Sequence, residues 1–129
     1  MARIEKFEDI DAWKLAREAT RQIYAISSVG EFARDYALRD QIRRSSISTM
    51  SNIAEGFERE GNKEFLNFPS IAKGSCAESR SQLYVALDQK YITPAQFEST
   101  YGWLTEAGRV TGGFMRYLQN SDFRGSKYR

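Results

Sequence analysis

The strongest structural signal in the chain is a helix start at Thr93-Pro94, followed by a long run of regularly spaced, mostly apolar residues. Threonine can cap the free amides of a first helical turn, proline fits its first position, and Gln96 completes a capping box. The residues that follow alternate between steps of four and three, the period of a helix packed in a bundle. They are Phe97, Tyr101, Leu104, Gly108, Thr111, Met115 and Leu118. The sequence therefore predicts a helix over residues 94–118.

Three earlier stretches repeat the helical period of apolar residues, and no alternating strand pattern lies between them. They predict helices over residues 10–28, 34–58 and 63–89. Short connections between amphipathic helices are typical of antiparallel neighbours. We therefore expect an all-α fold, an antiparallel up-and-down four-helix bundle.

Polar residues stand where two of these helices are expected to start. Asp9 or Asp11 is expected to cap the first helix, and Asn62 the third. Pro69 lies inside the third helix, where proline removes one intrahelical hydrogen bond and clashes with the preceding turn. We therefore expect a kink or a late start of that helix at Pro69.

The length of 129 residues fits one domain with a single core. The bundle is expected to occupy residues 1–118, and a flexible basic tail residues 119–129. No apolar run approaches the roughly 20 residues that cross a bilayer. The single cysteine, Cys76, gives no reason to expect an oxidising compartment. We expect a cytoplasmic protein without membrane contact.

The absence of histidine removes the commonest general base and the commonest transition-metal ligand. Cys76 has only Lys73 nearby to activate a thiolate, so burial in the core is the favoured interpretation. No glycine-rich phosphate loop precedes a helix start. We therefore expect a protein that is not an enzyme and that holds no metal and no cofactor.

The second and third predicted helices each carry a face of small polar residues. Such a face lets another backbone approach and shares hydrogen bonds, so we interpret it as a contact face. Glu55 and Glu78 could form a carboxylate pair for a metal ion, but di-iron bundles of that kind also need histidines. A structural polar network is the favoured interpretation, because buried carboxylates must find partners. Its predicted members are Ser48, Asn52, Glu55, Ser75 and Glu78.

The last predicted helix carries a second apolar seam beside the first: Trp103, Ala107, Val110, Phe114 and Tyr117. One seam can pack within the bundle, whereas a second bulky seam needs another partner. For a single-domain protein the simplest partner is another copy of itself. We therefore expect a homo-oligomer with Trp103, Val110, Phe114 and Tyr117 at its interface.

Several ordered fragments resemble the signature of a known bacterial family. They are QIRRSSIS at residues 41–48, NIAEG at 52–56, Phe7 with Trp13, Glu64-Phe65, AKGSCAE at 72–78 and Tyr91-Ile92. Together they resemble the four-helix bundle family known from 23S rRNA intervening sequences, over almost the whole chain. The resemblance implies a left-handed bundle, commonly a homopentamer. A related accessory protein of diversity-generating retroelements forms a basic pentamer that binds nucleic acid and a reverse transcriptase, so the resemblance also implies nucleic-acid binding.

The formal net charge of +2 is too small to indicate a nucleic-acid partner by itself, so the distribution of charge must decide. Cations gather on the first and second predicted helices: Lys14, Arg17, Arg21, Arg39, Arg43 and Arg44. One interpretation is an ordinary solvated surface. The other is a patch that an oligomer repeats into a surface for RNA or DNA. A protein-protein scaffold that binds another protein and no nucleic acid stays open as the alternative function.

Overall fold

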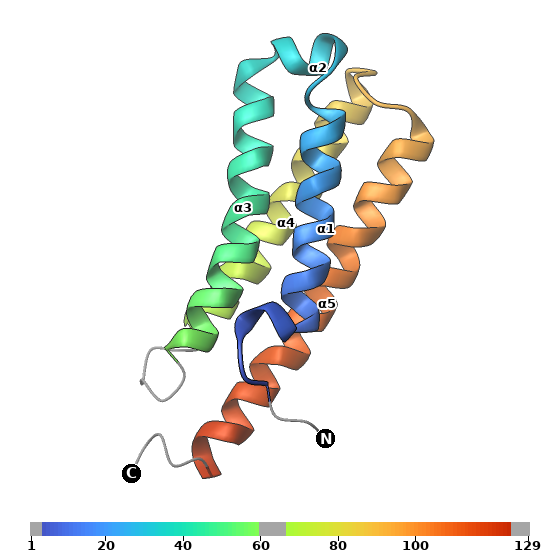
Figure 1. Ribbon diagram of the computed structural model, residues 1–129. Coiled ribbons are helices and arrows are strands. Elements are labelled where there is room, and N and C mark those ends of the chain that lie inside the picture. Colours follow the sequence, from blue (N-terminus) through green and yellow to red (C-terminus); the bar gives the residue numbers. More distant parts are fainter. Residues whose placement is uncertain (1–3, 60–66, 125–129) are drawn as a thin grey trace.

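The structure is a computed structural model, which describes residues 4–59 and 67–124, with side chains as far as residue 120. Four long helices dominate it, α1 (Asp11–Ile26), α3 (Tyr36–Glu58), α4 (Asn67–Asp88) and α5 (Pro94–Arg124) (Figure 1). Two short helices, η1 (Phe7–Asp9) and α2 (Gly30–Arg34), precede α1 and α3. Across the described residues there is no strand, so the predicted all-α fold is confirmed.

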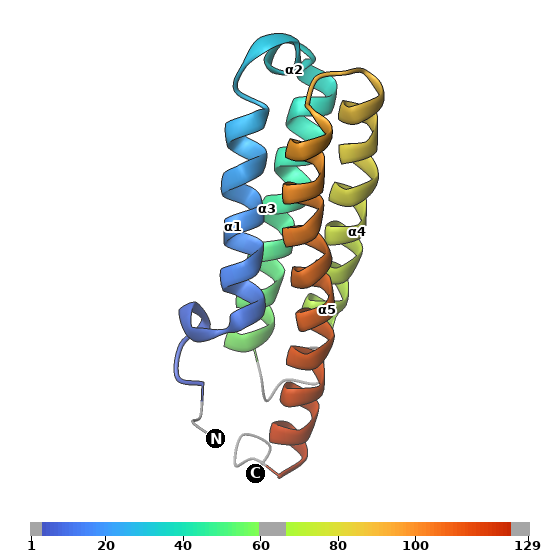
Figure 2. The same ribbon diagram turned by 90° about the vertical axis from the view of Figure 1, so that its right-hand side faces the viewer.

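Successive long helices run in opposite directions, and each packs against two of the other three (Figure 2). Helix α1 lies against α3 and α5, and α4 completes the ring between α3 and α5. A helix with two neighbours needs a broad apolar face rather than a single stripe. The predicted antiparallel arrangement of four helices is thus confirmed.

The inner face of α1 consists largely of alanine. Ala12, Ala16 and Ala19 follow one another at steps of four and three, and all three are buried together with Ile23. The distance between two packed helices depends on the size of the side chains at the contact, so alanine allows a close approach. Helix α1 therefore sits deep between α3 and α5, and its opposite face is left to solvent.

The first helix starts differ from the prediction. Neither Asp9 nor Asp11 caps α1, because η1 leads into α1 through Ile10, which is buried and forms no side-chain cap. Asp35 caps α3, where its carboxylate accepts a hydrogen bond from the amide of Leu38 at 3.1 Å. The prediction did not include α2, because a helix of five residues is too short to show an apolar period.

The later helix boundaries are closer to the prediction. The amide of Gln96 donates to the Thr93 hydroxyl at 3.1 Å, and the amide of Thr93 donates to Gln96 Oε1 at 2.9 Å, which is the predicted capping box. The described part of helix α4 runs from Asn67, with Pro69 buried near its start, and the expected kink or late start at Pro69 stays a prediction. The predicted cap Asn62 lies outside the described residues.

Helix α5 is longer than predicted. It continues to Arg124, so the first part of the predicted tail, residues 119–129, is helical. Leu118 is fully buried, which holds the helix on the bundle up to the predicted end. The Gly112-Gly113 pair does not interrupt α5. Sequence reasoning placed the helix end where the apolar period stops, although a polar helix can continue beyond the core.

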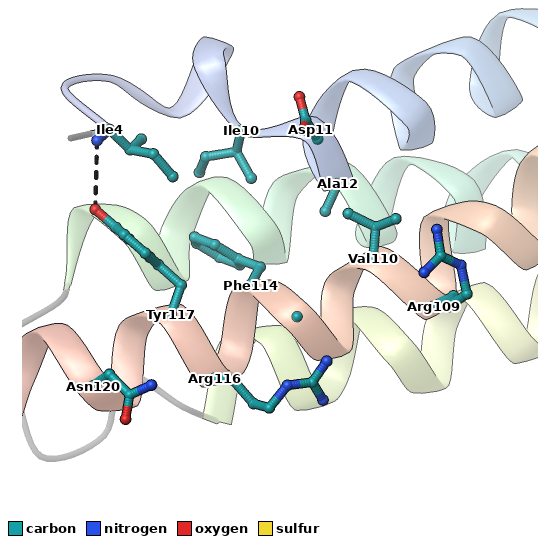
Figure 3. A pocket seen from close by; sticks show the side chains of 11 residues that line it. Ile4, Ile10, Asp11, Ala12, Arg109, Val110, Phe114, Arg116, Tyr117 and Asn120 are labelled. Carbon is teal, nitrogen blue, oxygen red and sulfur yellow. Dashed lines mark hydrogen bonds between the residues drawn. The ribbon is translucent and has the colours of Figure 1, made fainter. Parts of the chain in front are cut away.

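The first apolar seam of α5 and part of the second pack inside the chain, so the second seam does not by itself require another subunit, contrary to expectation. The first seam faces α4, where the thiol of Cys76 donates to the carbonyl of Leu104 at 2.9 Å. In the second seam Phe114 is only 5% exposed. Phe114 and Tyr117 both point toward the N-terminal segment, residues 4–10 (Figure 3). The physical reason is that α5 packs against both α1 and α4, so two of its faces are covered within the chain. Of the predicted interface residues, only Trp103 is exposed, since Val110 and Tyr117 are half-buried.

Helices α3 and α4 meet along the small polar residues that the sequence indicates as a contact face. The hydroxyls of Ser45 and Ser79 share a hydrogen bond of 2.6 Å, and those of Ser48 and Ser75 share one of 2.8 Å. Asn52 donates to the Ser48 hydroxyl at 3.1 Å. The hydroxyls thus satisfy one another between two closely packed helices.

Two predicted members of this network, Glu55 and Glu78, lie outside it. Glu55 forms an ion pair with Arg59 at 2.7 Å, about half exposed to solvent, and Glu78 is exposed. Gln82 joins the network instead, because its Oε1 accepts a hydrogen bond from the Ser45 hydroxyl at 2.8 Å. A carboxylate loses far more hydration than a hydroxyl when it is buried, so the acidic residues remain at the surface.

The contact between α3 and α4 is tightest at Gly56. A Cβ atom at this position would lie 2.7 Å from Cδ of Pro69 and 2.9 Å from its Cγ. At Gly74 of α4, by contrast, an added Cβ would meet nothing within 4 Å among the described residues. The two glycines therefore differ in packing, although both lie within helices.

We expect Gly56→Ala to lower the free energy of unfolding by about 1–3 kcal/mol, because it overpacks a closed contact. The matched control Gly74→Ala should raise it by up to about 1 kcal/mol through better helix propensity. Urea unfolding followed by circular dichroism measures both. Equal stabilisation by the two substitutions would show that α3 and α4 do not meet as closely as described.

Candidate nucleic-acid interface

The outer face of α1 carries a row of cations. Lys14, Arg17 and Arg21 are all exposed, and their spacing of three and four residues places them on one side of the helix. The alanines of the opposite face hold this helix in the bundle. The fold therefore displays the three predicted cations together on one surface.

These cations line a shallow depression of about 470 Å3 with the aromatic ring of Trp13 and two carboxylates, those of Glu8 and Glu18. The guanidinium of Arg17 lies over the Trp13 ring, 5.7 Å from its centroid. Arg21 pairs with Glu18 at 2.6 Å, although 70% of the Arg21 side chain stays exposed. The depression thus has one more positive than negative group, and it combines cations with an aromatic surface.

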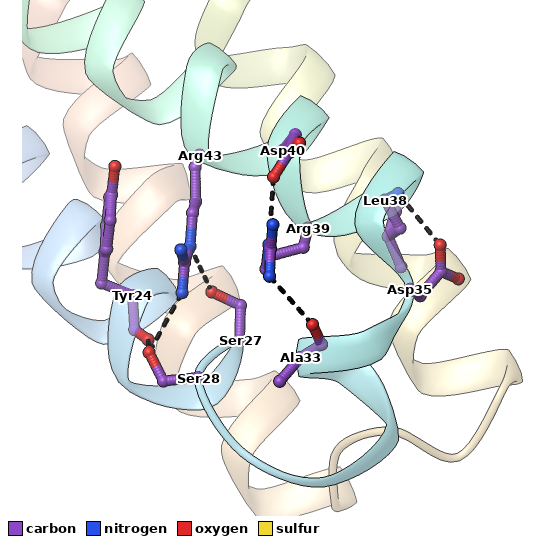
Figure 4. Close-up of polar contacts among 9 residues, drawn as sticks. All are labelled: Tyr24, Ser27, Ser28, Ala33, Asp35, Leu38, Arg39, Asp40 and Arg43. Atoms are coloured by element: carbon purple, nitrogen blue, oxygen red, sulfur yellow. Dashed lines mark hydrogen bonds and ion pairs between the residues drawn. The ribbon is translucent and has the colours of Figure 1, made fainter.

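Arg43 of α3 lies beside Tyr24, Ser27 and Ser28 at the C-terminal end of α1 (Figure 4). Its guanidinium lies over the ring of Tyr24, 4.3 Å from the centroid, and donates to the hydroxyls of Ser27 and Ser28 at 2.9 and 3.0 Å. Tyr24 comes three residues after Arg21, on the same side of α1. No carboxylate of the described residues lies within ion-pair distance of Arg43. The positive charge of the half-buried Arg43 is therefore not compensated by an ion pair.

The four cations form a row of definite length. Lys14 and Tyr24 are ten residues apart on α1, which corresponds to about 15 Å along the helix axis at about 1.5 Å per residue. Arg17 and Arg43 each lie over an aromatic ring at opposite ends of that distance. We name the surface made by Trp13, Lys14, Arg17, Arg21, Tyr24 and Arg43 the α1 face.

The remaining two predicted cations do not join the α1 face. Arg39 is held by the carboxylate of Asp40 and by the carbonyl of Ala33, both at 3.0 Å (Figure 4). The carboxylate of Asp40 compensates the charge of Arg39, and the hydrogen bond to Ala33 links α3 to α2. Arg44 is exposed one helical turn before Ser48, which contacts α4, so it lies toward the α4 side of α3. The predicted set of six is therefore divided among three places.

Sequence reasoning missed the two aromatic members of the α1 face. Trp13 and Arg17 are four residues apart on a helix, a spacing that already indicates contact. Tyr24 and Arg43 are distant in the sequence and meet only because α1 and α3 pack together. The second pair therefore has no local signal.

The described residues show no arrangement suited to catalysis by a thiol or to metal binding by protein side chains. Cys76 is buried, and burial raises the pKa of its thiol despite the nearby positive charge of Arg80. A buried thiol with a raised pKa is a poor nucleophile. In residues 4–59 and 67–120, no three histidine, cysteine, aspartate or glutamate side chains are grouped closely enough to hold a metal ion.

The chain is thus a small all-α bundle with cations and aromatic rings on one helix face. The comparison with protein families is more specific. The family model "23S rRNA-intervening sequence protein" matches residues 8–113, and the chain belongs to this family, as the resemblance implies.

A solved structure shares the fold. It is the crystal structure of a protein of unknown function from the S23 ribosomal protein family of Bacteroides thetaiotaomicron, with a TM-score of 0.72 and 24% sequence identity. The match covers 81% of this chain and 95% of that one. No curated protein matches the chain. Among the helices that the structure describes, none has the length and apolar character to cross a membrane.

We expect Cys76 to react with Ellman's reagent many times more slowly in the folded protein than in urea. The thiol is buried between α4 and α5, and its raised pKa keeps it protonated near neutral pH. Free glutathione at the same pH and urea concentrations gives the reference rate. Rapid, complete modification of the native protein would show an accessible, activated thiol and reopen a catalytic interpretation.

Proposed function

We propose that this protein is a non-enzymatic, oligomeric nucleic-acid-binding bundle that contacts the phosphates of RNA or DNA through its α1 face. The observation that carries the proposal is the row of Lys14, Arg17, Arg21 and Arg43, of which the first three are exposed and Arg43 is half-buried. Cations that neutralise phosphates supply most of the affinity in binding without sequence preference. The names of the matched family and of the solved relative refer to 23S rRNA and to a ribosomal protein, which supports this choice of partner.

The two aromatic rings of the α1 face support a role in binding unpaired bases. Trp13 is half-buried, and Tyr24 is 39% exposed. Bases of a single strand stack on aromatic side chains and on arginine planes, with little dependence on sequence. A strand lying along α1 would meet a ring at each end of the face and cations between them, so the face suits a single-stranded or looped region better than a regular duplex.

The net charge of +2 per chain is small for a protein that binds the phosphates of a nucleic acid. For that reason we also propose that the chain associates with copies of itself. A closed ring of identical chains repeats the α1 face and adds the fields of its copies. A pentamer is the form that the family resemblance favours. Such a ring would turn a modest patch into a continuous cationic surface.

Helix α4 carries two exposed aliphatic side chains that are free for contact between copies. Ile71 is 49% exposed and Val85 44% exposed, and their separation of fourteen residues puts them on one side of the helix. Part of the second seam of α5 is occupied within the chain. The outer side of α4 is therefore the proposed interface, in place of Phe114 and Tyr117.

Removal of the α1 cations should weaken nucleic-acid binding in a salt-dependent way. We expect the variant with Lys14, Arg17 and Arg21 changed to Ala to flatten the plot of log K against log salt. The slope should fall by about 0.9 on duplex DNA, and by about 0.7 on a single strand, for each phosphate that the variant no longer neutralises. Fluorescence anisotropy with a labelled oligonucleotide at several salt concentrations measures the slope.

The control variant changes Arg34, Arg59 and Lys73 to Ala, which removes the same number of exposed cations from other surfaces. We expect this control to keep most of the wild-type slope. Equal effects of the two variants would mean that only net charge matters. Absence of binding by the intact protein at low salt would favour a protein scaffold.

We expect the wild-type protein to scatter light as a homo-oligomer at micromolar concentration. Changing Ile71 and Val85 to Glu should shift the protein to a monomer without loss of helix content. The new charges would be buried in the proposed interface, which opposes association, whereas both positions are exposed in the folded single chain. Thr105→Glu with Gln119→Glu, which adds the same charge to exposed positions of α5, is the control. A wild-type monomer would contradict the oligomer.

The protein-protein scaffold stays a second candidate because several large apolar side chains other than Ile71 and Val85 are also exposed. They include Tyr36, Ile47, Tyr84 and Trp103. If the wild-type chain is oligomeric but binds no oligonucleotide at low salt, the exposed apolar groups become the better guide to its partners.

A further inference from the structure

A pocket of about 600 Å3 lies between the N-terminal segment and the C-terminal half of α5, away from the α1 face (Figure 3). Its lining is apolar at Ile10, Val110 and Phe114, with the ring of Tyr117 beside them. Sites for small molecules have volumes of about 300–1,000 Å3 and a mostly apolar lining with a few polar groups. The pocket has such a volume, and its lining combines these apolar side chains with the polar groups of Asp11, Arg109, Arg116 and Asn120.

The α5 wall of the pocket includes a glycine that helix packing does not require. This glycine is Gly113, which follows Gly112 in α5. A glycine in a helix interior is less favourable than alanine by about 1 kcal/mol. Among the described residues, the closest group to a Cβ added at Gly112 or Gly113 is the guanidinium of Arg116, at 3.8 and 3.7 Å. Neither glycine has a positive φ. At Gly56 the missing side chain lets another helix approach closely. At Gly112 and Gly113 no other helix comes close among the described residues, and the missing side chains leave open space beside Arg116.

The rim of the pocket carries one cation without an ion-pair partner among the described residues, Arg116. The other rim arginine, Arg109, is paired with Glu106, and this pairing lowers the pKa of the Glu106 carboxyl. Asp11 stands across the pocket at the start of α1. An acidic group of a ligand is therefore directed to the Arg116 side, and a ligand with several negative charges is disfavoured by Asp11.

The aromatic lining defines the rest of the ligand. The rings of Phe114 and Tyr117 are nearly parallel, with an interplanar angle of 16° and centroids 6.4 Å apart. The backbone amide of Ile4 donates to the Tyr117 hydroxyl at 3.4 Å, which fixes the Tyr117 ring against the N-terminal segment (Figure 3). Phe114 is buried and supports the half-buried Tyr117 ring, so a flat apolar group can lie against Tyr117 with little loss of side-chain freedom.

We propose that this pocket binds a small, flat, apolar molecule with one acidic group, its rings against Val110 and Tyr117 and its acid at Arg116. The space beside Gly113 admits the ligand, and the guanidinium forms a charge-assisted hydrogen bond with its carboxylate, sulfonate or phosphate. This site shares no residue with the α1 face, so it stands independently of nucleic-acid binding.

Two dyes of similar shape test the proposal on the full chain. Anilinonaphthalene sulfonate carries an acidic group, and phenylnaphthylamine is its neutral counterpart. Both become fluorescent in an apolar site, and titration gives the stoichiometry and Kd. The variants are Gly113→Leu, which fills the pocket, Arg116→Gln, which removes the cation, and Gly102→Leu, a control at an open glycine elsewhere on α5.

We expect one saturable site per chain for both dyes in the wild-type protein. Gly113→Leu should weaken both dyes by at least tenfold, while Gly102→Leu leaves both unchanged. Arg116→Gln should weaken the sulfonate dye by about tenfold, the effect of about 1.4 kcal/mol, and leave the neutral dye unchanged. Cooperative urea unfolding of each variant establishes that it is folded.

Three results would overturn the proposal. They are absence of saturable binding by the wild-type protein, unchanged binding by folded Gly113→Leu, and equal effects of Arg116→Gln on the two dyes. The second result would place the dyes elsewhere on the surface. The third would leave an apolar cavity without selectivity for an acid.

Discussion

The rest of the structure depends on the close contact between α3 and α4. Serine hydroxyls pair across it at Ser45 and Ser79 and again at Ser48 and Ser75, and Gly56 admits the ring of Pro69 at its end. Because these polar groups satisfy one another, the two helices can approach closely without leaving a buried hydroxyl unpaired. Helices α1 and α5 then close the ring through alanine, leucine and aromatic side chains.

The position of α1 in that ring connects the packing to the proposed function. Its alanine face sinks between α3 and α5, so the opposite face presents Lys14, Arg17 and Arg21 to solvent. Packing of α1 on α3 also brings Arg43 over Tyr24, which adds a fourth cation to the row. The side of α1 that is small enough to be buried therefore decides where the proposed phosphate-binding surface lies.

Much of the fold could be predicted from the sequence, because apolar periods and the Thr93-Gln96 capping box are local signals. The short α2 and the helical continuation of α5 to Arg124 lie beyond those periods, and the prediction misses both. The site was harder to predict. The spacing of cations on α1 is visible in the sequence, but contacts such as Arg43 with Tyr24 depend on how helices pack. The partly occupied second seam of α5 shows the same limit, since an apolar face does not reveal which neighbour covers it.

The measurement that tests the central claim most directly is ultraviolet cross-linking of the wild-type protein to a single-stranded oligonucleotide, followed by mass spectrometry of the cross-linked peptides. The account predicts cross-links at Trp13 and Tyr24, the rings beside Arg17 and Arg43, and their loss as salt is raised. Cross-links confined to α4 or α5, or none at low salt, would contradict the assignment of the α1 face as the nucleic-acid interface.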